Sequence, residues 1–236
     1  MKLVHLLEFL GESLQEFEGD ENVDICGITC DSRQVSAGYI FVAIRGANSN
    51  GEQFIKQAVQ AGAALIVAQS SLHLSCPSLR VDNTYLTLAL LAEQFYGRPA
   101  QSMRLIGLTG TNGKSSTSFI LEHILQTAGM STGVLGTIHN RFASLVEKSV
   151  LTTPDAVTLQ QLLQRMKNAK VEIAVLEVSS HALEQYRCGL KNFDIALFSN
   201  LTQDHLDYHG DMENYFQSKK KLFTEGLKES GLAVIN

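Results

Sequence analysis

The stretch LIGLTGTNGKSS, residues 105–116, decides the fold of this chain. It predicts a buried strand, a glycine-rich turn and the first turn of a helix, in that order. Such a turn points several backbone N–H groups into one concavity, and the helix N-terminus adds positive potential there. Gly110 and Gly113 let the backbone approach phosphate oxygens without a Cβ in the way. The stretch therefore predicts a nucleoside-triphosphate site.

The polar side chains of this turn suit that chemistry. Lys114 can reach the outer phosphates, and the Ser115 hydroxyl can ligate Mg²⁺. A strict Walker A motif has a glycine six residues before the lysine, where this chain has Leu108. The alternative is a glycine-rich strand–helix turn with a chance lysine, but an amphipathic helix follows in the required order. Its apolar positions are Phe119, Ile120, Ile124 and Leu125. The expected ATP-binding residues are Gly110, Thr111, Asn112, Gly113, Lys114, Ser115 and Ser116.

Size and composition narrow the class of protein. The 236 residues are enough for one large domain or two modest ones. The formal net charge of −5 and the lack of a long Lys/Arg block argue against nucleic-acid partners. No apolar stretch approaches the roughly 20 residues needed to span a bilayer. The four cysteines lack disulfide-like spacing, so we expect reduced thiols in the cytoplasm, with Cys26 and Cys30 as small core residues.

The breaker Gly97-Arg98-Pro99 is the best candidate for a domain boundary. Before it we expect a small mixed α/β domain, with strands at 23–30, 40–44 and 64–68 and helices at 54–61 and 84–95. After it, strands are expected at 104–109, 131–135, 173–177, 195–200 and 233–236, and helices at 115–128, 158–169 and 212–228. The fold class is therefore α/β, with domains at 1–97 and 98–236.

Apolar strands separated by helices predict, for the second domain, a parallel sheet covered on both faces. Ligands of such sheets collect at the C-terminal ends of the strands. Those ends carry Gly110, residues 177–181 and residues 200–205, so the informative polar residues should converge on one edge. The last apolar run, at 232–235, lies directly before the final residue, so we expect this P-loop-type domain to be incomplete.

Four separated segments, 109–116, 177–183, 200–210 and 215–219, resemble the Mur ligases of peptidoglycan synthesis. The segment DHLDYHG at 204–210 is the most discriminating and looks like the MurE type. Enzymes of that type add meso-diaminopimelate, or L-lysine, to UDP-MurNAc-L-Ala-D-Glu. Residues 31–33, 38–43 and 50–51 are similar to the family's uridine-binding domain.

The resemblance implies an ATP-dependent, ADP-forming amide ligase of the cytoplasm that works through an acyl phosphate. Residues 1–97 would bind the UDP-sugar, and residues 98–236 would be a truncated central ATP-binding domain without the family's third domain. The implied partners are small molecules, namely ATP, the UDP-MurNAc-dipeptide and the diamino acid, with Mg²⁺ as cofactor. Neither nucleic acid nor membrane insertion is implied, and we expect a monomer.

The catalytic residues implied are Lys114, Glu177, His205 and Lys219. Glu177 ends a buried strand beside the glycine-rich turn, where a carboxylate needs a partner and can bind Mg²⁺. Lys219 matches the family lysine that CO₂ converts to a carbamate, N6-carboxylysine, which is a carboxylate-like metal ligand. Tyr215, one helical turn earlier, favours Lys219 over its two lysine neighbours. The metal ligands implied are Ser115, Glu177, His205 and carbamylated Lys219.

The substrate-binding residues are carried over from the same resemblance. The uridine pocket maps to Cys30, Ser32, Ala47, Asn48 and Ser49. The peptide or muramoyl part maps to Thr152, Thr153, Ser179, Gln185 and Arg187. Arg187 is a natural partner for a carboxylate or phosphate, because a guanidinium binds these groups with two parallel hydrogen bonds. Leu151 stands where the family can have an asparagine.

Other interpretations stay open at this point. One is another ligase of the superfamily, such as MurF, folylpolyglutamate synthase or cyanophycin synthetase. The uridine-like first domain argues against folylpolyglutamate synthase, and DHLDYHG argues against MurF. Another is a non-catalytic fragment that binds a UDP-sugar or a nucleotide and never ligates. A P-loop GTPase switch would lack a recognisable base-specificity motif and leaves Lys219 without a role.

Overall fold

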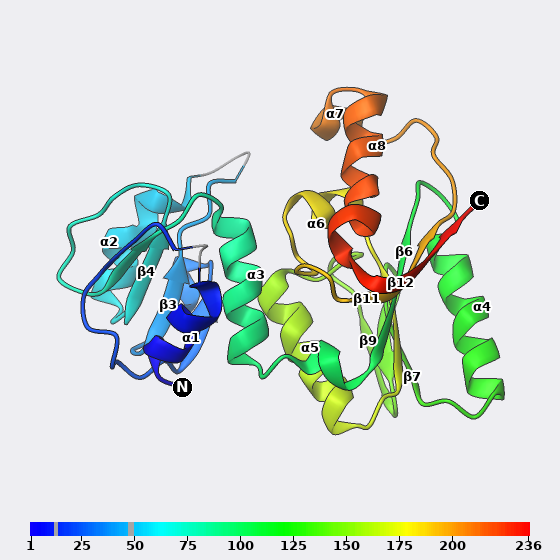
Figure 1. Cartoon of the computed structure of the whole chain (residues 1–236), viewed down its shortest axis with the longest axis horizontal. Coiled ribbons are helices and arrows are strands. Elements are labelled where there is room, and N and C mark those ends of the chain that lie inside the picture. The colour runs from blue at the N-terminus through cyan, green and yellow to red at the C-terminus, as the bar shows by residue number, and fades with distance from the viewer. Residues whose placement is uncertain (12–13, 47–49) are drawn as a thin grey trace. The chain divides into compact units, whose positions relative to one another are not determined.

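The computed structural model describes residues 1–11, 14–46 and 50–236 (Figure 1). The chain forms two compact units, Met1–Gly97 and Arg98–Asn236. Within the described residues, no helix has the length and apolar character needed to cross a membrane.

The first unit is a five-stranded sheet with helices packed on it. The strand order is β1-β5-β4-β3-β2, and only the β1–β5 pair is antiparallel. Its strands are β1 (Glu16–Glu18), β2 (Gly27–Thr29), β3 (Tyr39–Val42), β4 (Leu65–Ala68) and β5 (Ser78–Arg80). Its helices are α1 (Leu3–Leu10), α2 (Ile55–Gln60) and α3 (Thr84–Phe95), with 3₁₀ turns at η2 (Ser32–Gln34) and η3 (Gly51–Phe54).

The second unit is a seven-stranded mixed sheet, in the order β12-β11-β6-β10-β7-β8-β9. Its strands are β6 (Arg104–Thr109), β7 (Thr132–Leu135), β8 (His139–Phe142), β9 (Leu145–Lys148), β10 (Ile173–Glu177), β11 (Phe193–Phe198) and β12 (Leu227–Ile235). The first five strands in the spatial order are parallel, and β8 and β9 continue the sheet as an antiparallel hairpin. The predicted α/β class is confirmed.

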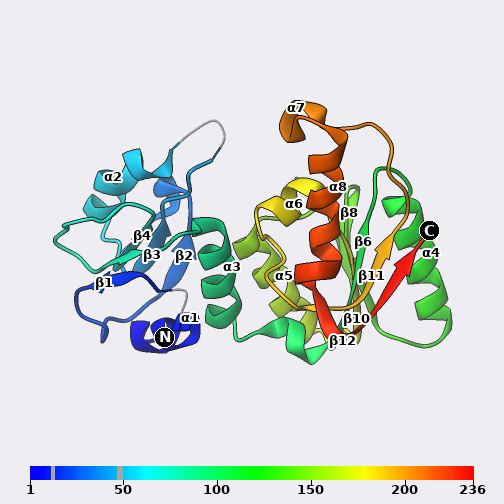
Figure 2. The same cartoon turned by 45° about the horizontal axis from the view of Figure 1, so that its top comes forward.

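Helices cover both faces of this sheet. They are α4 (Lys114–Thr127), α5 (Ala156–Asn168), α6 (Ser180–Glu184), α7 (Leu206–His209) and α8 (Met212–Lys221), together with the turns η4 (Pro99–Ser102) and η5 (Leu222–Gly226). Figures 1 and 2 show α4 on one side of the sheet and α5 and α6 on the other. Successive side chains of β10 point to opposite faces of the sheet, which agrees with helices on both sides. Val175 packs in the cluster under α4, and Leu176 packs in the cluster with α5.

Several sequence expectations differ from the structure. Cys26 and Cys30 are exposed and are not core residues. Helix α8 ends at Lys221, one π-turn follows, and β12 begins at Leu227 rather than near residue 233. Gly226 in that turn lies against the Phe193 ring, where an added Cβ would be 3.3 Å away.

The apolar residues of α4 also divide differently from the expectation. Leu125 packs against the sheet, as expected, and Leu121 packs there too. Phe119, Ile120 and Ile124 are exposed instead. Phe119 lies under the guanidinium of Arg141, 4.0 Å from the ring centroid. The buried face is set by the spacing of residues 118, 121 and 125, which lie on one side of a helix.

Candidate functional site

The glycine-rich turn between β6 and α4 has the backbone conformation that its sequence predicts. Gly110 has a φ of 139° and Gly113 a φ of 86°, in the region that side chains with a Cβ rarely adopt. An added Cβ at Gly110 would overlap the Ser199 hydroxyl and lie 3.0 Å from the Asn200 carbonyl oxygen. Glycine is therefore required at this position for both conformation and space.

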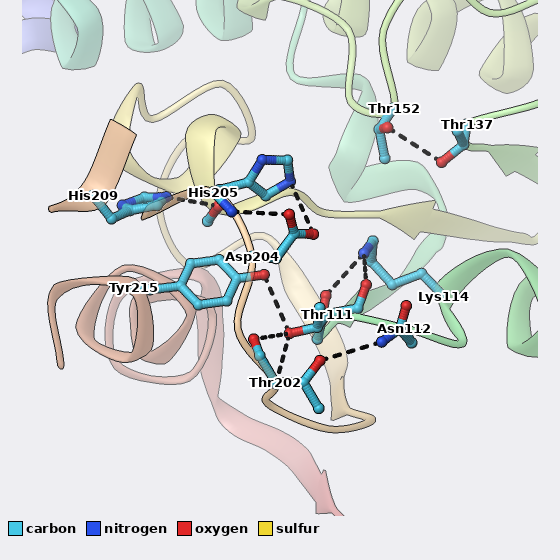
Figure 3. Close-up of polar contacts among 12 residues, drawn as sticks. Thr111, Asn112, Lys114, Thr137, Thr152, Thr202, Asp204, His205, His209 and Tyr215 are labelled. Atoms are coloured by element: carbon cyan, nitrogen blue, oxygen red, sulfur yellow. Dashed lines mark hydrogen bonds and ion pairs between the residues drawn. The ribbon is translucent and has the colours of Figure 1, made fainter. Parts of the chain in front are cut away.

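The loop after β11 braces this turn. The Thr111 N–H donates to the Asn200 carbonyl (2.9 Å), and the Asn112 N–H donates to the Asn200 side-chain oxygen (3.0 Å). The Thr111 hydroxyl lies 3.1 Å from the Thr202 carbonyl, 3.0 Å from the Thr202 N–H and 3.3 Å from the Tyr215 hydroxyl (Figure 3). Ser199 donates to the Asn112 carbonyl at 2.6 Å. The turn is thus held in shape by contacts from residues 199–202 and from Tyr215.

Two lysines meet at the carbonyl oxygen of Gly110. Lys114 Nζ donates to it at 2.8 Å and to the Thr111 carbonyl at 3.0 Å, and Lys219 Nζ donates to it at 3.0 Å. Burial lowers the pKa of Lys114, against the attraction of the Glu177 and Asp204 carboxylates. A cationic amine in this position is ready to move from backbone carbonyls to an incoming anion.

Lys219 is the buried member of the three-lysine run. Its side chain is 1% exposed, and Nζ lies 4.4 Å from the Tyr215 ring centroid. Burial, together with the nearby charge of Lys114, lowers the pKa of Lys219 to about 7. In contrast, Lys220 is exposed and Lys221 pairs with Glu184 at 3.0 Å. A large fraction of Lys219 is therefore a neutral amine near neutral pH.

Glu177 is a buried carboxylate at the end of β10, and it is only 2% exposed. Its Oε2 accepts from the hydroxyls of Ser115 (2.9 Å) and Thr137 (2.7 Å), and its Oε1 lies 3.3 Å from the Ser118 hydroxyl. Gly136 packs directly on the carboxylate, because an added Cβ would overlap it. The Ser115 and Thr137 hydroxyls thus replace water that this carboxylate would otherwise bind, and Ser118 makes a longer third contact.

The expected peptide-binding residues form one network next to Glu177. Arg187 donates to the Thr153 carbonyl (2.8 Å) and to the Gln185 side-chain oxygen (2.9 and 2.7 Å). The Thr153 hydroxyl donates to the Glu177 carbonyl at 2.9 Å and accepts from the Ser179 N–H at 3.0 Å. Since Thr153 is 1% exposed, its hydroxyl is used inside the protein, and Thr152 is the more accessible threonine.

The histidines of DHLDYHG lie in and around α7. His205 has a φ of 53°, and its Nε2 is 3.5 Å from Asp204 Oδ2. Its ring meets the His181 ring edge to face, with centroids 5.2 Å apart. His209 Nε2 is 2.9 Å from the Ser180 hydroxyl (Figure 3). Burial lowers the pKa of both His181 and His209. The His209 side chain thus connects α7 to α6.

The candidate uridine-binding residues belong to the first unit. Cys30 is exposed, and Ser32 is buried with its hydroxyl donating to the Gln57 side-chain oxygen at 2.9 Å. Asp31 caps the 3₁₀ turn that follows and pairs with Arg33 at 2.7 Å. Ala47, Asn48 and Ser49 lie outside the described residues. The structure thus describes two of these five residues.

Ser115 and Glu177 fit a magnesium ion. Mg²⁺ takes oxygen ligands at about 2.1 Å in an octahedron, so neighbouring ligand oxygens lie about 3 Å apart. The Ser115 and Glu177 oxygens are 2.9 Å apart. Within the described part of the chain, no cluster of three or more His, Cys, Asp or Glu side chains could hold a metal. A divalent ion here would therefore need nucleotide phosphates or water as further ligands.

Thr137, Ser118 and Ser199 were not expected at the site, whereas Asn200 and Thr202 belong to the segment 200–205 that was expected at this edge. The position of Thr137 in the sequence could have indicated it, because it comes two residues after the end of β7, directly after Gly136. Ligands of parallel sheets collect at this edge. Nothing in a single sequence marks Ser118, which is an ordinary hydroxyl one turn into a helix.

This fold and turn define an α/β protein with a phosphate-binding loop of the nucleoside-triphosphatase kind. Residues 108–236 match the family model "Mur ligase middle domain", and residues 24–96 match "Mur ligase family, catalytic domain". The chain belongs to the Mur ligase family.

Curated relatives also support membership of the Mur ligase family. The UDP-N-acetylmuramoyl-L-alanyl-D-glutamate–2,6-diaminopimelate ligase of Bacillus licheniformis is 44% identical over 225 residues, which is 95% of this chain and 46% of that protein. The ligase of that name from Aquifex aeolicus is 43% identical over 210 residues, which is 89% of this chain and 43% of the relative. The chain therefore spans about half the length of the curated relatives it matches.

Solved structures agree on the fold. One of a UDP-N-acetylmuramoyl-L-alanyl-D-glutamate–2,6-diaminopimelate ligase superposes with a TM-score of 0.81 at 28% identity, over 100% of this chain and 47% of that one. MurF from Acinetobacter baumannii gives a TM-score of 0.60 at 20% identity, over 98% of this chain and 47% of that one, and this likeness concerns the fold alone.

Proposed function

We propose that this chain supplies the UDP-sugar-binding and ATP-binding parts of a MurE-type amide ligase. The substrate would be UDP-MurNAc-L-Ala-D-Glu, and the amino acid added would be meso-diaminopimelate or L-lysine. The single observation that carries the proposal is the part-buried Ser115–Glu177 contact at the end of a turn whose lysine donates to backbone carbonyls. The relatives named above for this reaction, at 43–44% identity, support the choice of substrate.

The reaction requires an activated carboxylate, because a carboxylate does not acylate an amine at neutral pH. A carboxylate oxygen of the substrate attacks the γ-phosphorus of ATP, ADP leaves, and an acyl phosphate forms. The amine of the incoming amino acid then adds to the acyl carbon and loses a proton, and the tetrahedral intermediate expels inorganic phosphate. The protein's task is to hold two anions in line and to neutralise crowded negative charge.

Lys114 would leave the Gly110 and Thr111 carbonyls and bind the β- and γ-phosphates. Backbone N–H groups of residues 113–116, at the start of α4, would contact the phosphates, since those of Thr111 and Asn112 are bonded to Asn200. Ser115 and Glu177 would hold Mg²⁺, which neutralises phosphate charge when bound. Arg187 would bind a substrate carboxylate, with Thr152, Ser179 and Gln185 around the peptide, and Thr153 would support them from inside the protein.

Lys219 would carry a carbamate. Its neutral amine attacks the carbon of CO₂ and one proton is released, which turns a cation into an anion that can ligate a second metal ion with His205. The pKa of about 7, produced by burial, supports this step because only the unprotonated amine reacts. An unmodified Lys219 cation beside Lys114 would repel a metal ion.

The first unit would bind the UDP-sugar through residues near Cys30, Ser32 and 47–49. We further propose that the protein acts in the cytoplasm as a monomer on small-molecule substrates. The relatives are about twice as long, so a second candidate is a binding module that holds substrate and nucleotide and leaves ligation to a longer polypeptide.

The test is a ligation assay with this chain, ATP, Mg²⁺, UDP-MurNAc-L-Ala-D-Glu and either diamino acid, with product mass as the readout. Formation of a UDP-MurNAc-tripeptide together with ADP supports the ligase. If the chain binds the dipeptide substrate but forms no ADP, the second candidate, a binding module, is supported. A folded chain that neither binds nor ligates contradicts both.

A further inference from the structure

Thr137 was not expected at the site, but its side chain contacts two residues that were. It follows β7, and its hydroxyl lies 2.7 Å from Glu177 Oε2 and 3.2 Å from the Thr152 hydroxyl (Figure 3 shows the second contact). We propose that Thr137 is a positioning residue that fixes Glu177 for the magnesium–nucleotide complex and links it to the substrate loop through Thr152. This inference rests on the proposed function.

The direction of the hydrogen bonds follows from counting protons. A threonine hydroxyl has one proton to donate, and an ionised carboxylate only accepts. Thr137 is the donor in both contacts, and its single proton goes mainly to Glu177 because that contact is shorter and its acceptor is charged. The weaker contact with Thr152 keeps the substrate loop beside Glu177.

The other hydroxyls around Glu177 do not duplicate this role. In the proposed function, Ser115 is itself a ligand of the ion. Ser118 lies 2.8 Å from the Ser115 carbonyl and 3.3 Å from Glu177 Oε1, so its single proton goes mainly to the carbonyl. Thr137 is thus the near hydroxyl that can orient the carboxylate without touching the ion. Gly136 closes the adjacent space, because a Cβ there would overlap the carboxylate.

The experiment is calorimetric titration of this chain with ADP, once with Mg²⁺ and once with a chelator. Thr137→Val keeps the shape and removes the hydroxyl. A hydrogen bond to a charged group contributes about 1.5 kcal/mol or more, so the affinity for Mg²⁺–ADP should fall about tenfold. The affinity for magnesium-free ADP should stay within about twofold of wild type, and Thr137→Ser should restore most of the loss. The Thr152→Val effect should add nothing in the Thr137→Val background.

Thr127→Val is the matched control, since it removes a hydroxyl that donates to a backbone carbonyl at the far end of α4. Equal losses with and without Mg²⁺, wild-type affinity in Thr137→Val, or additive effects of the two threonine variants would each overturn the inference. Thr137→Ala gives the same comparison if the valine variant does not fold. A wild-type chain that is folded and binds no Mg²⁺–ADP would overturn the nucleotide site itself, and this inference with it.

Discussion

Lys219 shows how burial changes the chemistry of one residue. An exposed lysine is almost fully protonated at neutral pH, because its ordinary pKa is about 10.4. Burial lowers the pKa of Lys219 to about 7, so the neutral amine becomes abundant as the pH rises through that value. This residue therefore has the protonation state that CO₂ capture needs, while Lys220, one position along the helix, is exposed.

We expect ¹³C-labelled CO₂ to form a carbamate on this chain, seen by ¹³C nuclear magnetic resonance. At constant dissolved CO₂, the initial rate of carbamate formation should rise with pH and reach half of its maximum near pH 7, because protonated amine does not react. Lys219→Met should abolish the signal, and Lys220→Met should leave it unchanged. A carbamate that survives Lys219→Met would contradict the assignment.

Lys114 should contribute strongly to the affinity for ATP. Lys114→Ala removes the cation that would leave two backbone carbonyls to bind phosphates, so ATP affinity should fall by about tenfold or more. Lys167→Ala, at an exposed position in the last turn of α5, is the control for the loss of one positive charge. Unchanged ATP affinity in Lys114→Ala, measured by calorimetry, would remove Lys114 from the site.

Among the elements, the long regular ones could be predicted from the sequence and the short irregular ones could not. Strands β6 and β10 have the expected bounds because continuous apolar runs mark them. The β8–β9 hairpin was missed because its turn uses Ala143 at a φ of 49°, without the glycine or asparagine that usually marks such turns. Strands β1 and β5 have three residues each, too few for a periodic signal.

The same contrast holds for the site. The convergence of Gly110, residues 177–181 and residues 200–205 on one edge could be predicted, because each segment follows an apolar strand of a parallel sheet. The individual contacts of Thr137 and Ser199 could not, because they join segments 40 and 87 residues apart along the chain. Only the strand order brings these segments together.

The turn between β6 and α4 should not tolerate a side chain at Gly110. Gly110→Ala would force a Cβ into the Ser199 side chain at a φ that alanine rarely adopts, at a cost of about 1–3 kcal/mol. Nucleotide affinity should fall with stability, since the turn must shift away from the phosphates. Gly129→Ala is the control, because it has a φ of 80° with no atom within 4 Å of the added Cβ. Equal effects of the two variants on nucleotide binding would contradict this role of Gly110.

For the whole molecule, the two units should respond to different ligands. Hydrogen exchange of backbone amides should slow around residues 109–118 and 199–202 when Mg²⁺–ADP is added, since these segments build and brace the turn. UDP should slow exchange only within residues 1–97, where the proposed uridine pocket lies. Protection by UDP within the second unit would contradict the assignment of the two domains.

The proposed function predicts that the whole molecule distinguishes between two UDP-sugar precursors. The most direct test is calorimetric titration of the folded chain with UDP-MurNAc-L-Ala-D-Glu and, in parallel, with UDP-MurNAc-L-Ala. We predict tighter binding of the dipeptide form by about tenfold or more, because Arg187 would pair with the additional carboxylate. Equal binding of the two compounds, or tighter binding of the shorter one, would contradict the claim that this chain belongs to the MurE step.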